Sequence, residues 1–141
     1  MKNLLLLVPI GLLSLFAFAP SEVNSIREVV ESYAQAGDNQ DTEALEAVLH
    51  EGFRVVWNDP GKNTVSLISK TDYVQLLGTK KIGGDKRKVI IESIDISEGI
   101  NASVRVVLDG EKGDFWNLLS LVKHDGKWLI AQDLVTAKFG G

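Results

Sequence analysis

The N-terminal half of the chain carries apolar residues at three- and four-residue steps, the spacing of amphipathic helices. The first stripe runs through 25–36 and ends before Gly37; its members are Ile26, Val29, Val30 and Tyr33. Ser25 is its candidate N-cap, because Glu28 three residues later completes a capping box. The second stripe occupies 41–50. Each predicted helix has one apolar face, so each must cover another element.

From Gly52 the pattern changes to that of strands. The segment 53–57 is β-branched and aromatic, 59–63 is turn sequence, and 64–68 is the expected return strand. A third short helix is predicted over 69–77. Four further strands are predicted at 88–97, 102–108, 115–123 and 127–136. Because helices and strands are segregated rather than alternating, we expect an α+β fold with an antiparallel sheet.

Apolar residues occupy both parities of the strand predicted at 88–97: Val89 and Ile91, but also Ile90, Ile94 and Ile96. A strand with one solvated face would alternate cleanly. We therefore expect both faces of the sheet to be covered, one by the helices and the other by a second copy of the chain. Closed homodimers are the commonest oligomers, so the expected partner is a homodimer formed through the sheet.

The first residues have the layout of a secretory signal peptide. Residues 4–18 carry no charge, Lys2 precedes them, and the small-x-small tripeptide 17–19 follows. We expect 1–19 to be a signal peptide and 20–141 to be a single domain, which predicts a secreted or periplasmic protein. Pro20 disfavours cleavage directly before it, and a retained segment would anchor the protein to the membrane.

Composition excludes several classes of function. The 141 residues include no cysteine, which rules out a disulfide framework, a thiolate zinc site and thiol catalysis. A pI near 5.1 argues against a nucleic-acid partner. His50 and His124 have no neighbours at zinc-ligand spacing, and neither a metal nor a cofactor is predicted. Five basic residues crowd the segment 80–88; we interpret them as a solvated loop, because no phosphate-binding glycine motif occurs.

Three stretches resemble a known family. The first runs from Tyr33 to Asp38 and continues to Leu49-His50 before a strand; the second is 68–73. The third and most specific reads F-W-N-L-L-S-L-V-K from Phe115, then D-G-K-W-L-I. The chain resembles the putative lumazine-binding family of the nuclear transport factor 2-like superfamily, whose pattern there is F-x-D-Y-L-x-L-L-K, then D-G-x-W-x-I. This resemblance implies a cone: a curved antiparallel sheet wrapped around three helices from the N-terminal half.

A cone has an apolar interior with an open mouth, and such concavities are the usual small-molecule sites. We expect a small apolar or aromatic ligand, with these candidate contacts: Tyr33, His50, Trp57, Tyr73, Trp116 and Asn117. The aromatic residues could equally be core packing, and His50 a cap at the end of the second helix. Trp116 lies on the strand face opposite Asn117, so it also fits the dimer face. Asn117 stands where the family usually has Asp, which removes the charge that an acid-dependent role would need.

Asp59 is the catalytic candidate. Ketosteroid isomerase, of the same superfamily, takes its general base from an Asp-Pro at the end of the first strand, and Asp59-Pro60 resembles that motif. A carboxylate inside an apolar cone would have a raised pKa and could move protons. The isomerase's helix tyrosine falls on Val30, however, which cannot donate a hydrogen bond. The segment 58–61 is also ordinary turn sequence.

The favoured prediction is therefore an exported, non-catalytic protein that binds a small molecule in an apolar cone. Two alternatives stay open at this point. One is an isomerase- or dehydratase-like enzyme with Asp59 as base and Tyr33 or His50 as electrophile. The other is a dimerising protein-interaction module that uses the open face of the sheet.

Overall fold

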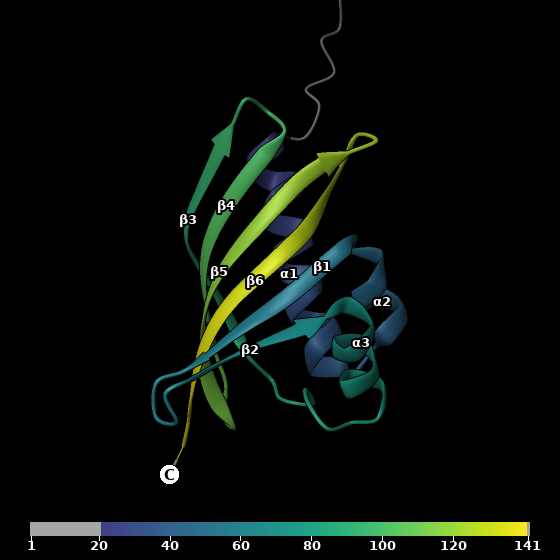
Figure 1. Ribbon diagram of the computed structural model, residues 1–141. Helices are drawn as coiled ribbons and strands as arrows, with labels where there is room; N and C mark the ends of the chain where they lie inside the picture. The colour runs from purple at the N-terminus through teal and green to yellow at the C-terminus, as the bar shows by residue number, and fades with distance from the viewer. Residues whose placement is uncertain (1–20, 141) are drawn as a thin grey trace, which may run out of the picture.

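The computed structural model describes residues 21–140, so the expected signal peptide at 1–19 lies outside the described residues. Within them the elements follow the predicted order (Figure 1). The helices are α1 (Glu22–Asn39), α2 (Thr42–Ala47) and α3 (Lys70–Gly78). The strands are β1 (Leu49–Asp59), β2 (Thr64–Ser69), β3 (Lys88–Ser97), β4 (Asn101–Asp109), β5 (Gly113–His124) and β6 (Lys127–Phe139). None of the helices in this part of the chain is long and apolar enough to cross a membrane.

Helix α1 is longer at both ends than the sequence pattern indicated. Ser21 is its N-cap, with Oγ accepting from the backbone N–H of Asn24 at 3.2 Å, so Ser25 lies inside the helix. The helix also continues through Gly37, and the chain turns only at Gln40, whose φ of 52° is left-handed. Hydrogen bonds from the Gln40 N–H to the last carbonyls end the helix without a C-terminal glycine.

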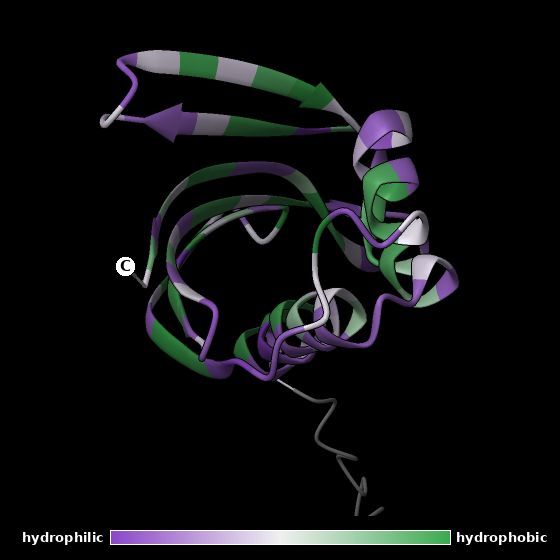
Figure 2. Ribbon diagram, turned by 90° about the horizontal axis from the view of Figure 1, so that it is seen from below, coloured by the Kyte–Doolittle hydropathy of each residue, from purple (hydrophilic) through white to green (hydrophobic). Residues whose placement is uncertain are grey.

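The six strands form one sheet in the order β2-β1-β6-β5-β4-β3. Strands β3 to β6 are an antiparallel meander, as predicted, and β1 and β2 form the predicted hairpin. One pairing departs from the antiparallel rule, because β1 runs parallel to β6. The sheet curves strongly, and α1 lies across its concave side (Figures 1 and 2). This is the expected cone.

A β-bulge explains the mixed parity of β3. Ile91 pairs with Val106, but the next pair is Ser93 with Arg105, so Glu92 is an extra residue. The bulge reverses the alternation, and the apolar residues on both sides of it face the core: Val89, Ile91, Ile94 and Ile96. Only Ile90 points outward. One extra residue accounts for the pattern of this strand, so its mixed parity does not indicate a second covered face, and the homodimer stays a prediction.

A second bulge lies in β6. Leu121 of β5 pairs with Ile130, but Ser120 pairs with Gln132, so Ala131 is the extra residue. Before the bulge the buried positions are Trp128 and Ile130; after it they are Asp133 and Val135. The bulge therefore decides which side chains of the last strand face the interior of the cone.

The hydrophobic core lies between the concave face of the sheet and the helices. Its fully buried side chains come from every layer: Ile26, Val30, Leu45, Val55, Leu77, Val104, Val106, Leu108, Leu119, Leu121 and Ile130. Burying a side chain of this size is worth about 1.5–3 kcal/mol. Four aliphatic core residues also line the cavity described next: Val55, Leu77, Leu108 and Val135.

Candidate ligand-binding cavity

A cavity of about 470 Å³ opens between the concave sheet face, α1, α3 and the loop that leads to β3. Aromatic rings form much of its wall: Tyr33, Trp57, Tyr73, Phe115 and Phe139. Leu76, Leu77, Ile68 and Leu108 add aliphatic surface. Trp57 packs edge-on against Phe115, with ring centroids 6.4 Å apart, and lies nearly parallel to Phe139 at 6.3 Å. The cavity is thus rigidly walled by packed rings.

One polar cluster interrupts the apolar wall, and Asp133 of β6 is its centre. Asp133 is only 3% exposed. The Tyr33 hydroxyl donates to its Oδ2 at 2.7 Å, and the Asn117 Nδ2 donates to both carboxylate oxygens at 2.9 Å. The hydroxyls of Tyr33 and Tyr73 are 3.2 Å apart. Tyr33 of α1 and Asn117 of β5 therefore meet at the carboxylate of β6, and Tyr73 of α3 joins the cluster through the Tyr33 hydroxyl.

The surroundings of Asp133 shift its pKa toward neutral pH. Burial raises the pKa of Asp133 to about 6, although hydrogen bonds from Asn117 and Tyr33 and the charge of Arg87 act against the rise. Burial, and then the charge of Asp133, raise the pKa of Tyr33 well above its ordinary value. Burial also raises the pKa of Tyr73. Both tyrosines therefore stay protonated and keep their hydroxyls as hydrogen-bond donors.

Asn117 contributes a buried acceptor beside Asp133, unpaired among the described residues. The Asn117 side chain is 4% exposed, and its Nδ2 donates to both carboxylate oxygens of Asp133. Its Oδ1 is buried and has no donor within residues 21–140. A buried polar atom without a partner costs about 1–3 kcal/mol, so a ligand N–H or O–H at this point would relieve a real penalty.

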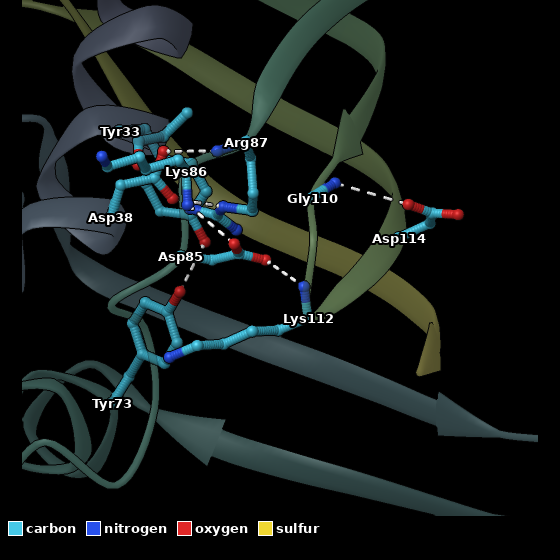
Figure 3. Close-up of polar contacts among 10 residues, drawn as sticks. Tyr33, Asp38, Tyr73, Asp85, Lys86, Arg87, Gly110, Lys112 and Asp114 are labelled. Carbon is cyan, nitrogen blue, oxygen red and sulfur yellow. Dashed lines mark hydrogen bonds and ion pairs between the residues drawn. The ribbon is translucent and has the colours of Figure 1, made fainter. Parts of the chain in front are cut away.

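The loop 79–87, which forms one side of the mouth, is tied to the end of α1. The Arg87 Nε donates to Asp38 Oδ1 at 2.6 Å, its backbone N–H donates to Asp38 Oδ2 at 3.0 Å, and its Nη2 reaches the Ala34 carbonyl at 3.0 Å (Figure 3). The Gly84 N–H donates to the Gly37 carbonyl at 3.1 Å. A Cβ on Gly37 would lie 2.7 Å from the Arg87 Nη2, so a larger residue there would displace the guanidinium from the Ala34 carbonyl.

Asp85 ties the opposite side of the mouth to the same loop. It is 9% exposed and accepts from the backbone N–H of Lys86 at 2.7 Å and of Lys112 at 2.9 Å (Figure 3). Burial alone would raise the pKa of Asp85, but hydrogen bonds from the backbone of the β4–β5 hairpin and of Lys86 outweigh it and lower the pKa. The carboxylate is thus ionised and holds the hairpin against the loop.

Four of the six predicted ligand contacts meet in this cavity: Tyr33, Trp57, Tyr73 and Asn117. Their contact with a ligand stays a prediction. Two others lie elsewhere. Trp116 is 43% exposed on the convex face, which agrees with the alternative that its strand parity left open.

The placement of His50 is corrected. Helix α2 ends at Ala47, and His50 is the second residue of β1. Its Nδ1 accepts from the Gly52 N–H at 3.0 Å, and its ring lies 6.1 Å from that of His124 in the β5–β6 hairpin. His50 therefore neither caps the helix nor reaches the mouth of the cone.

The placement of Asp59 is also corrected. Asp59 ends β1 at the hairpin turn, where its Oδ1 accepts from the Lys62 N–H at 3.1 Å and its Oδ2 lies 3.8 Å from the Lys62 ammonium. It is partly exposed and does not line the cavity. The turn interpretation holds, and Asp59 lacks the enclosed position that a general base in the cone would need.

Asp133 is the site residue that the sequence reasoning missed. Strict alternation from Trp128 and Ile130 would place Gln132 inward and Asp133 outward. The bulge at Ala131 reverses this. The only sequence signal was an unexplained acidic residue within an apolar strand.

Within residues 21–140, no group of three or more His, Cys, Asp or Glu side chains is placed to hold a metal ion.

Solved structures of low sequence identity share the fold. A nuclear transport factor 2-like protein of unknown function from Shewanella baltica gives a TM-score of 0.74 at 21% identity, covering 84% of this chain and 95% of that chain. A ketosteroid isomerase-like protein from Erwinia carotovora gives 0.68 at 15% identity, over 86% and 100%. A protein described as a putative scytalone dehydratase from Novosphingobium aromaticivorans gives 0.64 at 20% identity, over 85% and 88%. These likenesses define the class of protein, the nuclear transport factor 2-like cone, and no activity.

The family follows from the sequence. The family model described as putative lumazine-binding matches residues 21–134, which is most of the chain. The chain therefore belongs to the putative lumazine-binding family, as its motifs predicted. A search of the curated proteins found no match.

Proposed function

We propose that this protein binds a small, planar, largely apolar molecule in the cone and does not transform it. The observation that carries the proposal is the cavity itself: about 470 Å³, walled by packed aromatic rings, with one buried polar cluster. Small-molecule sites are of this kind, with volumes of about 300–1,000 Å³ and a few convergent polar groups.

The polar cluster suggests how such a ligand is oriented. Asn117 Oδ1 and the Asp133 carboxylate are hydrogen-bond acceptors, so a ligand that contacts them needs N–H or O–H donors on the edge of its ring. The family description names lumazine, a planar ring with N–H groups, and that chemistry suits this wall. Trp57 and Phe115, which pack edge-on against each other, would contact the ring together from one side of the cavity.

The decisive experiment places a larger side chain inside the cavity and measures ligand binding. Val135 is buried and lines the cavity, whereas the preceding residue of β6, Leu134, points to the convex face. Calorimetric titration with lumazine should show binding that Val135→Phe weakens at least about tenfold, because the added ring occupies the ligand's volume. Leu134→Phe is the matched control and should bind as the unaltered protein does. Equal binding by both variants would reject the cavity as the site.

A second candidate function rests on Asp133. A buried carboxyl with a pKa of about 6 beside protonated tyrosines is suited to accept a carbon-bound proton and return it to another atom. An isomerase- or dehydratase-like reaction would then use Asp133, not Asp59, as base. We would follow the conversion of a β,γ-unsaturated ketosteroid to its conjugated isomer. Turnover that Asp133→Asn abolishes and Asp59→Asn preserves would favour the enzyme; no turnover would leave the binding function.

We also propose that a second copy of the chain covers the convex face. Five of the eight most exposed large apolar side chains in residues 21–140 lie there, in a band across the strands: Val65, Leu67, Ile90, Trp116 and Leu118. Light scattering should give twice the monomer mass, and Leu118→Glu should yield the monomer. Ser120→Glu, on the same face of β5 outside the band, is the control and should stay dimeric. A monomeric unaltered protein would reject the dimer.

Export remains part of the proposal. It rests on the charge-free segment 4–18 and the small residues that follow it. Expression of the full chain, fractionation and N-terminal sequencing test it: a mature N-terminus near residue 20 in the exported fraction supports a secreted or periplasmic protein. An intact N-terminus in the membrane fraction would indicate an anchor, and an intact one in the cytoplasm would overturn export.

A further inference from the structure

The mouth of the cavity is basic although the protein is acidic. Four basic side chains line the cavity, namely Lys80, Lys81, Arg87 and Lys112, against the two acidic side chains Asp85 and Asp133. The whole chain has a formal net charge of −4. Arg87 is committed to Asp38, and Asp85 is satisfied by backbone N–H groups. Within residues 21–140 the three lysines form no ion pair.

The backbone fixes these lysines on two sides of one opening. Lys80 and Lys81 follow α3, where their N–H groups donate to the Leu77 and Leu76 carbonyls at 3.0 Å each. Lys112 comes from the β4–β5 hairpin, and its N–H is held by Asp85. In Figure 3 its side chain extends from that hairpin in the direction of Tyr73. Three unpaired ammonium groups at the rim of a low-dielectric hollow concentrate positive potential there.

The inner wall has the opposite character. Above its pKa of about 6 Asp133 is an anion, and Asn117 Oδ1 beside it is an acceptor. A negatively charged group on a ligand would be repelled at this end and attracted at the mouth. The lining of the cavity is therefore polarised, with acceptors at the buried residues Asn117 and Asp133 and cations at the exposed residues Lys80, Lys81 and Lys112.

We infer that the ligand is an amphipathic anion: a planar ring that enters the cone, joined to a carboxylate, phosphate or sulfonate that stays at the mouth beside Lys80, Lys81 and Lys112. This inference rests on the proposed binding function and names its ligand class. The lysines orient the ligand and raise its rate of capture, while the rings supply most of the contact area.

A matched pair of fluorescent probes tests the inference. Anilinonaphthalene sulfonate carries the anion, and N-phenylnaphthylamine is the same ring system without it. We expect the sulfonate to bind about tenfold more tightly at low salt, and salt of about 0.5 M to remove the advantage. Lys80→Gln, Lys81→Gln and Lys112→Gln combined should weaken the sulfonate about tenfold and leave the neutral probe unchanged.

Two controls keep the outcomes distinct. Lys86, Lys88 and Lys127 do not line the cavity, and their combined change to Gln removes the same charge, so it should leave both probes unaffected. Val135→Phe should weaken both probes. Equal affinity for the two probes, or equal loss in both lysine variants, overturns the inference and leaves the binding function standing. Failure of both probes to bind, or binding that Val135→Phe does not alter, overturns both proposals.

Discussion

Aspartate has different surroundings at two places in this chain: Asp59 lies at the tip of a hairpin, and Asp133 lies in the middle of β6. Asp59 stands in the motif that resembles a catalytic one, yet it closes a turn and is partly exposed. Asp133 stands in no motif, yet it is buried in the cavity wall with hydrogen bonds from Tyr33 and Asn117. The chemistry of a carboxylate depends on its burial and its hydrogen-bond partners more than on the adjacent residues in the sequence. Burial and partners depend in turn on the face of the strand from which the side chain projects.

The largest expected effect comes from removing each carboxylate. At pH 5 we expect Asp133→Ala to lower the free energy of unfolding by about 3 kcal/mol, because the buried donors of Tyr33 and Asn117 lose their acceptor. Asp59→Ala removes one exposed turn contact and should cost less than about 1 kcal/mol. Urea unfolding of the two variants measures the difference. Similar costs at both sites would break the contrast drawn above.

The next effect is a dependence on pH. The pKa of Asp133 is about 6 in the folded chain against an ordinary 3.8, so the unfolded state ionises first as pH rises. Stability from this group is therefore complete below about pH 4, is lost between about pH 4 and 6, and totals about 3 kcal/mol at about 1.4 kcal/mol per pKa unit. The difference in unfolding free energy between the unaltered protein and Asp133→Asn should follow this curve. A difference that is flat from pH 4 to 7 would contradict the assignment.

Removal of the tyrosine hydroxyls should have the smallest effects on the free energy of unfolding. Tyr33→Phe removes a 2.7 Å hydrogen bond to the buried carboxyl and should cost about 2 kcal/mol. Tyr73→Phe removes only the 3.2 Å contact between hydroxyls and should cost about 0.5–1 kcal/mol. Thermal or urea unfolding at pH 7 ranks them. The reverse order would mean that Tyr73, and not Tyr33, is the main support of Asp133.

The fold could be predicted from the sequence because its elements carry regular patterns. Trp116 and Asn117 were assigned to opposite faces of β5 correctly, since no bulge interrupts the alternation there. The pattern failed in β3 and β6, where Glu92 and Ala131 each add one residue and reverse the faces. Nothing in the local composition marks these bulges, because they arise from pairing with a neighbouring strand.

The parts of the site that could not be predicted depend on contacts between distant segments. Leu49 continues the apolar stripe of α2, so a helix through His50 fitted the pattern as well as the strand that forms. The basic segment 80–88 was expected to be a solvated loop, and all four of its lysines are exposed. Lys80 and Lys81 line the cavity because Asp38 and Gly37, some forty residues earlier, hold the loop in place.

The extra residue in β6 has a consequence for how members of this family diverge. A relative lacking one amino acid between Ile130 and Asp133 would pair regularly there, and alternation from the isoleucine would still bring its aspartate inward. A relative that kept every amino acid but paired without the extra residue would instead turn the equivalents of Gln132 and Leu134 toward the guest molecule. Loss of a codon at this point is therefore the conservative change, and a shift in strand pairing is the one that exchanges the lining of the binding chamber.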